Sequence, residues 1–342
     1  MKILVGISGG VDSAYTAKKL LEEGHFVEGA VLVMHEHTEV SAAREAAESV
    51  GIKLHEIDCQ TPFNQVKENF ASEYVKGRTP NPCIICNERV KFKYLYDFAM
   101  KNGFDAIATG HYAKIEKLED EKSVRYALAI AEDVKKDQTY MLYRLGQDVL
   151  SHLVLPLSEG KKTEIREEAE KKGISAAKRS DSQEICFLPQ GNYTEYIESV
   201  CGKCDKGSFI DEKGCYLGEH KGIIHYTVGQ RKGLGIALGE RVFVTDINAN
   251  ENTVTLSKEY PGDKCVKVKD VIYSGIAEPT EATTIRVKVK LRYSAPLVSA
   301  TACLYPDKTA EITLDEQQRF SPGQSAVLYV DNRVICGGFI EK

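Results

Sequence analysis

A glycine-rich turn near the start of the chain contains the residue types that a phosphate site needs. An apolar run leads directly into Ser8-Gly-Gly-Val-Asp-Ser13 and then into a helical pattern. A strand-to-helix turn points several backbone N–H groups and the positive end of a helix dipole at one spot, which favours an anion. Gly9 and Gly10 allow close approach of the backbone. The turn fits neither a Walker loop nor a dinucleotide fingerprint, so we expect a different phosphate site, with an ordinary tight turn as the alternative.

Cysteines are the second group of residues that can do chemistry, and the chain has ten of them. Cys83-x-x-Cys86 follows two prolines that stiffen the chain, so we expect two reactive thiols on a rigid loop opposite the phosphate edge. Cys201-x-x-Cys204, followed by Cys215, can form a metal knuckle, but local packing or an exposed thiol pair is the favoured interpretation. Four others are expected to be plain buried apolar residues: Cys59, Cys265, Cys303 and Cys336.

These groups need a scaffold, and the first hundred residues predict an open parallel sheet with helices between its strands. We expect strands at 3–7, 27–33, 53–57 and 106–109, and helices at 12–23, 40–50, 63–75 and 90–101. Ligands of such sheets lie at the carboxyl ends of the strands. This rule places the Ser8–Ser13 turn, the residues after Val33 and the turn at 109–111 at one edge.

The rest of the chain changes character after Gly207. A hairpin (112–118 with 124–130) and helices come first, and short alternating strands follow at 241–247, 253–256, 285–293, 311–314 and 326–330. We therefore predict an α/β domain at 1–203, a small β-rich linking domain at 204–264 and a β-barrel at 265–342. Alternation along 285–293 puts four cations on one strand face, which suits nucleic-acid phosphates or is simply a solvated face: Arg286, Lys288, Lys290 and Arg292.

Composition limits the possible partners and compartments. The net charge is −5, so any polyanion must be held by a local basic patch. No apolar run approaches the roughly 18 residues of a membrane span. Lys2 precedes an apolar stretch, but Gly, Ser and Asp12 soon interrupt it, so we expect no signal peptide and a cytoplasmic protein.

Long motifs along the whole chain resemble those of tRNA-specific 2-thiouridylases, the MnmA family of PP-loop ATP pyrophosphatases. The matching segments are SGGVDS (8–13), GRTPNPCIICN (77–87), GHYA (110–113), KDQTYMLY (136–143), DSQEICF (181–187), HYTVGQRKGLGI (225–236) and LRYSAP (291–296). The resemblance implies a Rossmann-like PP-loop domain of the adenine nucleotide alpha hydrolase-like type. It also implies an ATP-dependent enzyme that adenylates the 2-oxygen of the wobble uridine in tRNA and then replaces it with sulfur.

The resemblance further implies roles for single residues. Cys186 resembles the persulfide carrier and Cys86 the nucleophile, with a transient disulfide between them, and Asp12 resembles an organiser of Mg²⁺ or pyrophosphate. ATP contacts are implied for Gly6, Ile7, Ser8, Gly9, Gly10, Val11, Asp12, Ser13, Leu32 and Gly110. Contacts with tRNA are implied for Asn81, Pro82, Cys83, His111, Lys136, Asp137, Gln138, Arg292, Tyr293 and Gln324. The implied partners are tRNA and a sulfur-donor protein or sulfide source, and the oligomeric state stays open.

The sequence departs from the family pattern at one position. Many members have Asp where this chain has Cys83, so the site gains a third thiol. Cys83, Cys86 and Cys186 could then ligate an iron–sulfur cluster that carries sulfide, or Cys83 could be a spare thiol. A different PP-loop adenylating ligase is a further alternative. Such an enzyme uses ammonia or an amine and needs no cysteine, which distinguishes it from a thiolating enzyme.

Overall fold

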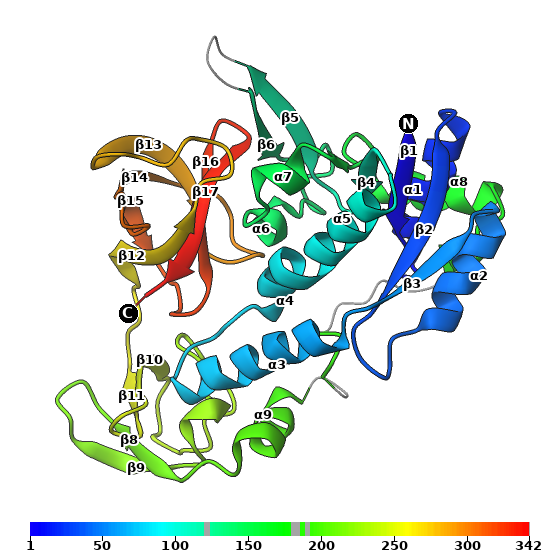
Figure 1. The fold of residues 1–342 in the computed structure, drawn as a ribbon. Helices are drawn as coiled ribbons and strands as arrows, with labels where there is room; N and C mark the ends of the chain where they lie inside the picture. The colour runs from blue at the N-terminus through cyan, green and yellow to red at the C-terminus, as the bar shows by residue number, and fades with distance from the viewer. Residues whose placement is uncertain (120–123, 179–184, 189–191, 342) are drawn as a thin grey trace.

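A five-stranded parallel sheet forms the first part of the molecule (Figure 1). The computed structural model describes residues 1–119, 124–178, 185–188 and 192–341. The sheet order is β3-β2-β1-β4-β7, built from β1 (Lys2–Gly6), β2 (Phe26–Val33), β3 (Leu54–Asp58), β4 (Ala106–Ala108) and β7 (Leu153–Val154). The four predicted strands are confirmed within two residues, and the short β7 was not predicted.

Helices cover both faces of this sheet because its strands alternate their apolar residues between two cores. Ile3 and Val5 point into one core, with α1 (Val11–Glu22), α2 (Val40–Val50) and α8 (Lys162–Lys171). Leu4 points into the other, with α3 (Gln60–Val75) and α5 (Phe92–Lys101). Shorter elements connect them: α4 (Pro82–Cys86), the π turn η1 (Asn87–Lys91), α6 (Thr139–Leu142), α7 (Gln147–Leu150), η2 (Ser175–Lys178) and α9 (Tyr193–Cys201).

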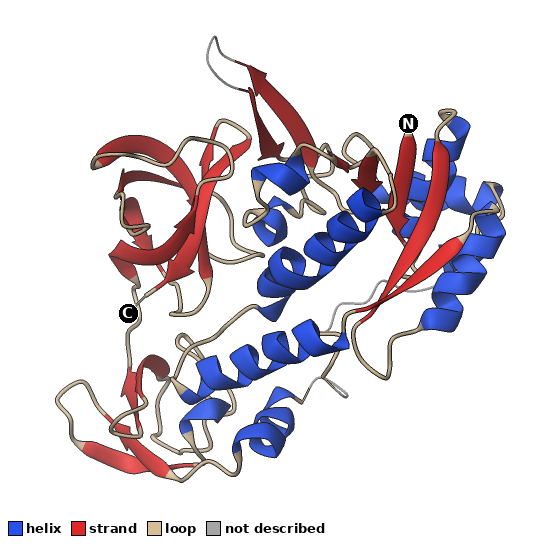
Figure 2. Cartoon of the chain, in the orientation of Figure 1, coloured by secondary structure: helices blue, strands red, loops and turns tan. Residues whose placement is uncertain are grey.

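Strands dominate the remaining chain, on the left of Figure 2. A small mixed sheet has the order β10-β11-β8-β9. Its elements are β8 (Gly207–Ile210), β9 (Tyr216–His220), the short helix η4 (Ile223–His225), β10 (Phe243–Asn248) and β11 (Thr253–Ser257).

The C-terminal strands form a barrel that closes through pairing of β12 with β17. They are β12 (Asp263–Ile272), β13 (Thr283–Lys290), β14 (Val298–Leu304), β15 (Ala310–Gln318), β16 (Ser325–Val330) and β17 (Arg333–Ile340). The hairpin of β5 (Lys114–Glu119) and β6 (Val124–Ala129) extends this sheet from the first part of the chain, because Arg333 pairs with Ala129. The predicted fold class is confirmed.

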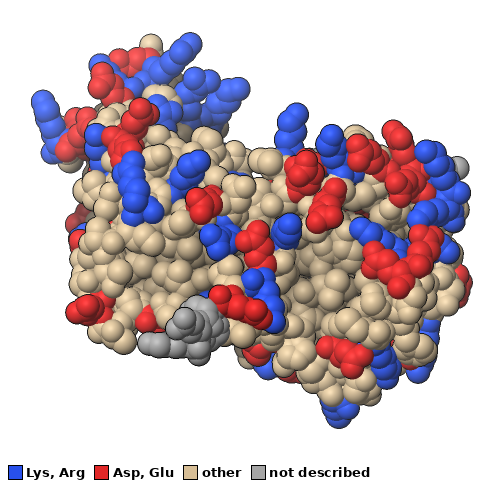
Figure 3. Space-filling view, turned by 90° about the horizontal axis from the view of Figure 1, so that it is seen from above, with Lys and Arg blue, Asp and Glu red and all other residues tan. Residues whose placement is uncertain are grey.

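The surface charges are mixed rather than uniform. On the face drawn in Figure 3, basic and acidic side chains are interspersed, and the basic ones gather most densely at a corner on the side of the β domains. A polyanion must therefore find local cations, as the net charge of −5 requires. Among the described residues, no helix is long and apolar enough to cross a bilayer.

Candidate functional site

The Ser8–Ser13 turn is preformed by its own hydrogen bonds. The Ser8 amide donates to Ser13 Oγ (3.2 Å), and Ser13 Oγ donates to the Gly10 carbonyl (2.9 Å). Gly9 has φ +80°, and a Cβ there would lie 2.8 Å from Ala42 Cβ, so only glycine fits. The turn leads straight into α1, which starts at Val11, and this is the geometry that a phosphate site requires.

The turn after β4 lies against this site, as the carboxyl-edge rule predicts. A Cβ on Gly110 would come within 2.7 Å of the Asp12 carbonyl carbon and 2.8 Å of the Ser13 amide nitrogen. Leu32, near the end of β2, is half-buried and packs on the core beneath the edge. Residues predicted to bind ATP from three strand ends therefore share one edge of the sheet.

Asp12 is held by two partners, neither of which was predicted from the sequence. Its Oδ1 accepts a hydrogen bond from Tyr112 OH (2.9 Å), and its Oδ2 pairs with Lys162 Nζ (2.5 Å). Lys162 begins α8, far along the chain, and nothing in the sequence marks it. Gln138 helps to hold Tyr112 in place, because its Oε1 accepts a hydrogen bond from the Tyr112 amide (2.9 Å).

Cys83 and Cys86 lie on a helix, so the prediction of a rigid loop is wrong. Pro82 occupies the first position of α4, where its missing N–H costs nothing. Asn81 caps the helix by accepting from the Cys83 amide (3.2 Å). Cys86 is buried at 4% exposure, and its Sγ lies 3.8 Å from Met34 Sδ, just beyond the end of β2. The helix thus delivers a thiol to the same edge of the sheet.

Cys186 reaches this region through an aromatic anchor. The next residue, Phe187, packs its ring on Phe63 (5.7 Å) and Phe70 (5.5 Å) of α3 and on Tyr196 (5.2 Å) of α9. Cys186 itself is exposed. It is close enough to Cys86 to raise the pKa of the Cys86 thiol, so the structure brings together two thiols from distant parts of the sequence. The preceding motif residues 181–184 lie outside the described part of the chain.

Lys91 is the cation of this thiol cluster. Burial raises the pKa of Cys86 to about 12. The surrounding protein also removes part of the water around the exposed Cys186 and so raises its pKa, and Lys91 opposes both shifts by favouring the thiolates. Burial alone would lower the pKa of Lys91, but Cys86, Cys83 and Cys186 together raise it. Lys91 was not predicted, because its place beside the thiols depends on the π turn.

His111 lies beside the phosphate edge, and the charge of Lys91 acts on its ring. Burial, helped by Lys91, lowers its pKa to about 3, so its ring is neutral at physiological pH. One ring nitrogen, Nδ1, lies 2.9 Å from Thr109 Oγ1. His111 directly follows Gly110, which contacts the start of α1. Lys91 of the thiol cluster therefore acts on a residue that directly follows the contact with α1.

The described residues contain no group of three or more His, Cys, Asp or Glu arranged to hold a metal ion. Ligation of an iron–sulfur cluster by Cys83, Cys86 and Cys186 stays a prediction. The second cysteine motif, which lies within the described residues, forms no such group, and in it Cys201 and Cys215 are exposed and Cys204 is half-buried. Cys265 is exposed, contrary to expectation, because it lies on the outer face of β12, and Cys303 is only half-buried.

The residues predicted to contact tRNA lie in different environments. Lys136 is exposed, but Asp137 is 5% exposed and accepts hydrogen bonds from Thr139 Oγ1 (2.6 Å) and the Ala131 amide (3.3 Å). The Asp137 carboxylate therefore holds its own loop together, and a contact of this residue with tRNA stays a prediction. Contacts by Lys136 and Gln138 stay predictions.

The basic strand is shorter than expected. β13 ends at Lys290, so Arg292 and Tyr293 lie beyond it. The predicted alternation holds, with Val287 and Val289 buried. Arg286, however, is paired with Asp315, which interrupts the stripe of four cations. Tyr293 is 40% exposed, with Lys290 Nζ 5.5 Å from its ring centre.

The barrel braces the segment that carries the thiols. Gln324 Nε2 donates to the Thr79 carbonyl (2.6 Å), and the Thr79 amide donates to the Pro322 carbonyl (2.8 Å). The side chain of Gln324, predicted to contact tRNA, is therefore committed to the residues just before Asn81.

Comparison with known proteins agrees with this architecture. Three family models match in order: the tRNA methyl transferase HUP domain (1–190), its PRC-barrel domain (194–258) and an aminomethyltransferase β-barrel domain (263–340). A tRNA-specific 2-thiouridylase MnmA of Clostridioides difficile is 41% identical over all of this chain and 98% of its own length. That of Acetivibrio thermocellus is 42% identical over 99% of each chain.

Similarity to solved structures is much weaker. A 4-thiouridine synthetase–RNA complex with bound ATP aligns with 58% of this chain and 50% of its own at 20% identity and TM-score 0.39, from which we draw no conclusion. The full-length sequence matches are decisive: the chain belongs to the family of tRNA-specific 2-thiouridylases, MnmA.

Proposed function

We propose that this enzyme replaces the 2-oxygen of the wobble uridine of tRNA with sulfur at the expense of ATP. The observation that carries the proposal is the convergence of Cys86, Cys186 and Lys91 beside a preformed phosphate turn. Its full-length relatives are named for the same reaction. A PP-loop ligase that transfers nitrogen would have no use for the thiols.

The first half-reaction activates the uridine. The Ser8–Ser13 turn binds the phosphates of ATP, and Mg²⁺ would be held by those phosphates and the Asp12 carboxylate, an all-oxygen set that suits this ion. The uridine 2-oxygen attacks the α-phosphorus, the bond from that phosphorus to the bridging oxygen breaks, and pyrophosphate leaves. The product is an adenylated uridine whose leaving group, AMP, is far better than an oxo group.

The second half-reaction delivers sulfur. A sulfur donor first leaves a persulfide on Cys186, the exposed thiol. The Cys86 thiolate attacks the inner sulfur of that persulfide, the sulfur–sulfur bond breaks, and hydrosulfide leaves as a Cys86–Cys186 disulfide forms. Hydrosulfide attacks C2 of the uridine and AMP departs. A thiol reductant then restores both cysteines.

Binding of tRNA requires the target base to leave its stack, which costs less in an anticodon loop than in a duplex. We assign its recognition to the helix start at Asn81, Pro82 and Cys83 and to His111. Arg292, Tyr293 and the exposed Lys136 supply contacts from the β domains. A pair of thiols that must be regenerated by reduction also supports the expected cytoplasmic location.

The proposal is tested with Cys86→Ser and Cys186→Ser. We expect each to lower formation of 2-thiouridine at least 100-fold while tRNA-stimulated release of pyrophosphate, the product of the first half-reaction, persists. Cys215→Ser, an exposed thiol in the small sheet region, is the control and should be neutral. Normal thiolation by both variants would refute the assignment, and release of ADP instead of AMP would refute the PP-loop chemistry.

A further inference from the structure

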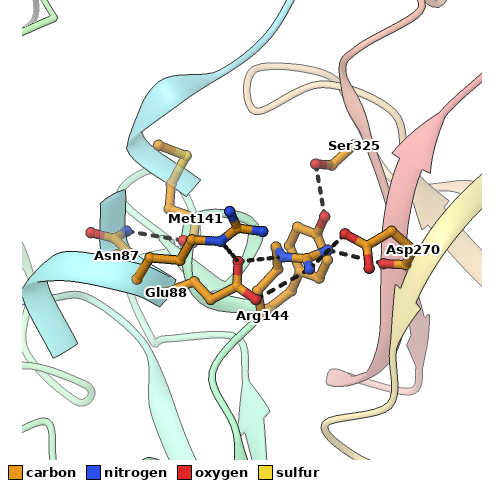
Figure 4. Close-up of polar contacts among 8 residues, drawn as sticks. Asn87, Glu88, Met141, Arg144, Asp270 and Ser325 are labelled. Carbon is orange, nitrogen blue, oxygen red and sulfur yellow. Dashed lines mark hydrogen bonds and ion pairs between the residues drawn. The ribbon is translucent and has the colours of Figure 1, made fainter. Parts of the chain in front are cut away.

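The buried side chain of Arg144 donates four hydrogen bonds that join two parts of the molecule (Figure 4). It is 4% exposed. Its Nε and Nη2 donate to the two carboxylate oxygens of Glu88 (2.8 and 3.1 Å). Its Nη1 and Nη2 donate to the carbonyl and the carboxylate of Asp270 (3.0 and 2.9 Å). Glu88 belongs to the π turn η1, and Asp270 belongs to barrel strand β12.

Single π turns are uncommon and concentrate at functional sites, and hydrogen bonds with another segment hold this one. Its first residue, Asn87, is held as well, since its Nδ2 donates to the Met141 carbonyl (3.0 Å). Met141 and Arg144 lie on one short segment, so this segment forms hydrogen bonds with both Asn87 and Glu88, the first two residues of the turn. Tyr140 and Tyr143 anchor this segment to the barrel through hydrogen bonds of 3.0 Å with Ser325.

The π turn decides where Lys91 lies relative to Cys86. In an α-helix, five residues advance about 140° past a full turn, which would put residues 86 and 91 on different faces. The wider turn closes over five residues, as the bond from the Phe92 amide to the Asn87 carbonyl shows, and so brings Lys91 back towards Cys86. The charge of Lys91 then lowers the pKa of both Cys86 and Cys186.

We propose that Arg144 is a positioning residue that holds the π turn through Glu88, keeps Lys91 at the thiols and ties this arrangement to the barrel through Asp270. The inference rests on the proposed sulfur transfer for its biological meaning. The geometric claim can be tested without that reaction, because it concerns only the reactivity of a thiol.

The test is the rate of iodoacetamide alkylation of Cys186 in the full-length, reduced protein between pH 7 and 9.5, read by mass spectrometry of its peptide. Cys186 is already exposed, so the rate reports thiolate fraction rather than access. We expect Glu88→Gln and Lys91→Met each to slow alkylation at pH 8 at least threefold and to move its pH profile upward. Lys93→Met removes an exposed lysine of the following helix, α5, which is paired with Asp97, and should change neither.

The decisive comparison is the double variant. If Glu88 acts through Lys91, then adding Glu88→Gln to Lys91→Met produces no further slowing. Additive effects, or an unchanged profile in Glu88→Gln, would overturn the proposal. Asp270→Asn leaves the contact between Arg144 and Glu88 in place and is the milder variant to use if Glu88→Gln folds poorly. We expect Asp270→Asn to slow alkylation less than Glu88→Gln does. Slowing as large as that of Lys91→Met would contradict the route through Glu88. Absence of thiouridine in the wild-type assay would instead refute the proposed function.

Discussion

Asp12 shows how one residue can be prepared for chemistry by neighbours that the sequence does not reveal. Its position in the glycine-rich turn could be predicted, but its partners Tyr112 and Lys162 could not, because they lie far along the chain. The pair with Lys162 keeps a carboxylate and a cation together at the phosphate edge. The charge of Asp12, rather than its shape, should therefore matter.

Asp12→Asn tests this point. The amide preserves size and can still accept from Tyr112, but it loses the charge that pairs with Lys162 and attracts Mg²⁺. We expect tRNA-stimulated pyrophosphate release to fall at least 100-fold with little change in the melting curve. Asp97→Asn, on the exposed face of α5, is the control. Activity within threefold of wild type would exclude Asp12 from the ATP reaction.

His111 makes the stability of the protein depend on pH. Its folded pKa of about 3 lies below the ordinary value of 6.5, so only the unfolded chain takes up this proton as pH falls below 6.5. The stabilising contribution is therefore present above pH 6.5 and is lost in acid. We expect His111→Gln to lessen the drop in unfolding free energy between pH 7 and 5 by about 1–2 kcal/mol in urea titrations. An identical drop in both proteins would contradict the buried neutral ring.

At the scale of elements, regular patterns were predictable and local exceptions were not. The strand β2 and the helix α2 follow from apolar periodicity. The helix α4 was missed because Pro80 and Pro82 suggest a loop, although proline is favoured at a first helical position, where Pro82 lies. The π turn has no sequence signature, and it accounts for the failure to predict Lys91. The candidate thiols could be paired only through the family resemblance, since no local pattern connects them.

Gly110→Ala tests the packing of two elements at the phosphate edge. The added methyl group would lie under 3 Å from the start of α1, so the turn after β4 must move away from Asp12. We expect the KM for ATP to rise at least tenfold. Gly103→Asn, at a left-handed turn with open space around it, is the control and should keep a normal KM. An unchanged KM in Gly110→Ala would show that ATP does not use this edge.

At the scale of the whole molecule, the barrel does more than add a surface, because Gln324 and Asp270 hold the segments on either side of the thiols. Gln324→Leu removes the donor to the Thr79 carbonyl. We expect a loss of about 1 kcal/mol in stability and a severalfold lower rate of thiolation. Gln317→Leu, exposed on β15, is the matched control. Equal behaviour of the two variants would mean that the barrel does not brace the site.

The most direct test of the account is a single turnover of persulfide-loaded enzyme with ATP and tRNA in the absence of reductant, followed by peptide mass spectrometry. The account predicts a Cys86–Cys186 disulfide that accumulates in step with 2-thiouridine, one for one. Formation of 2-thiouridine while both cysteines remain free, or linked to other residues, would contradict it.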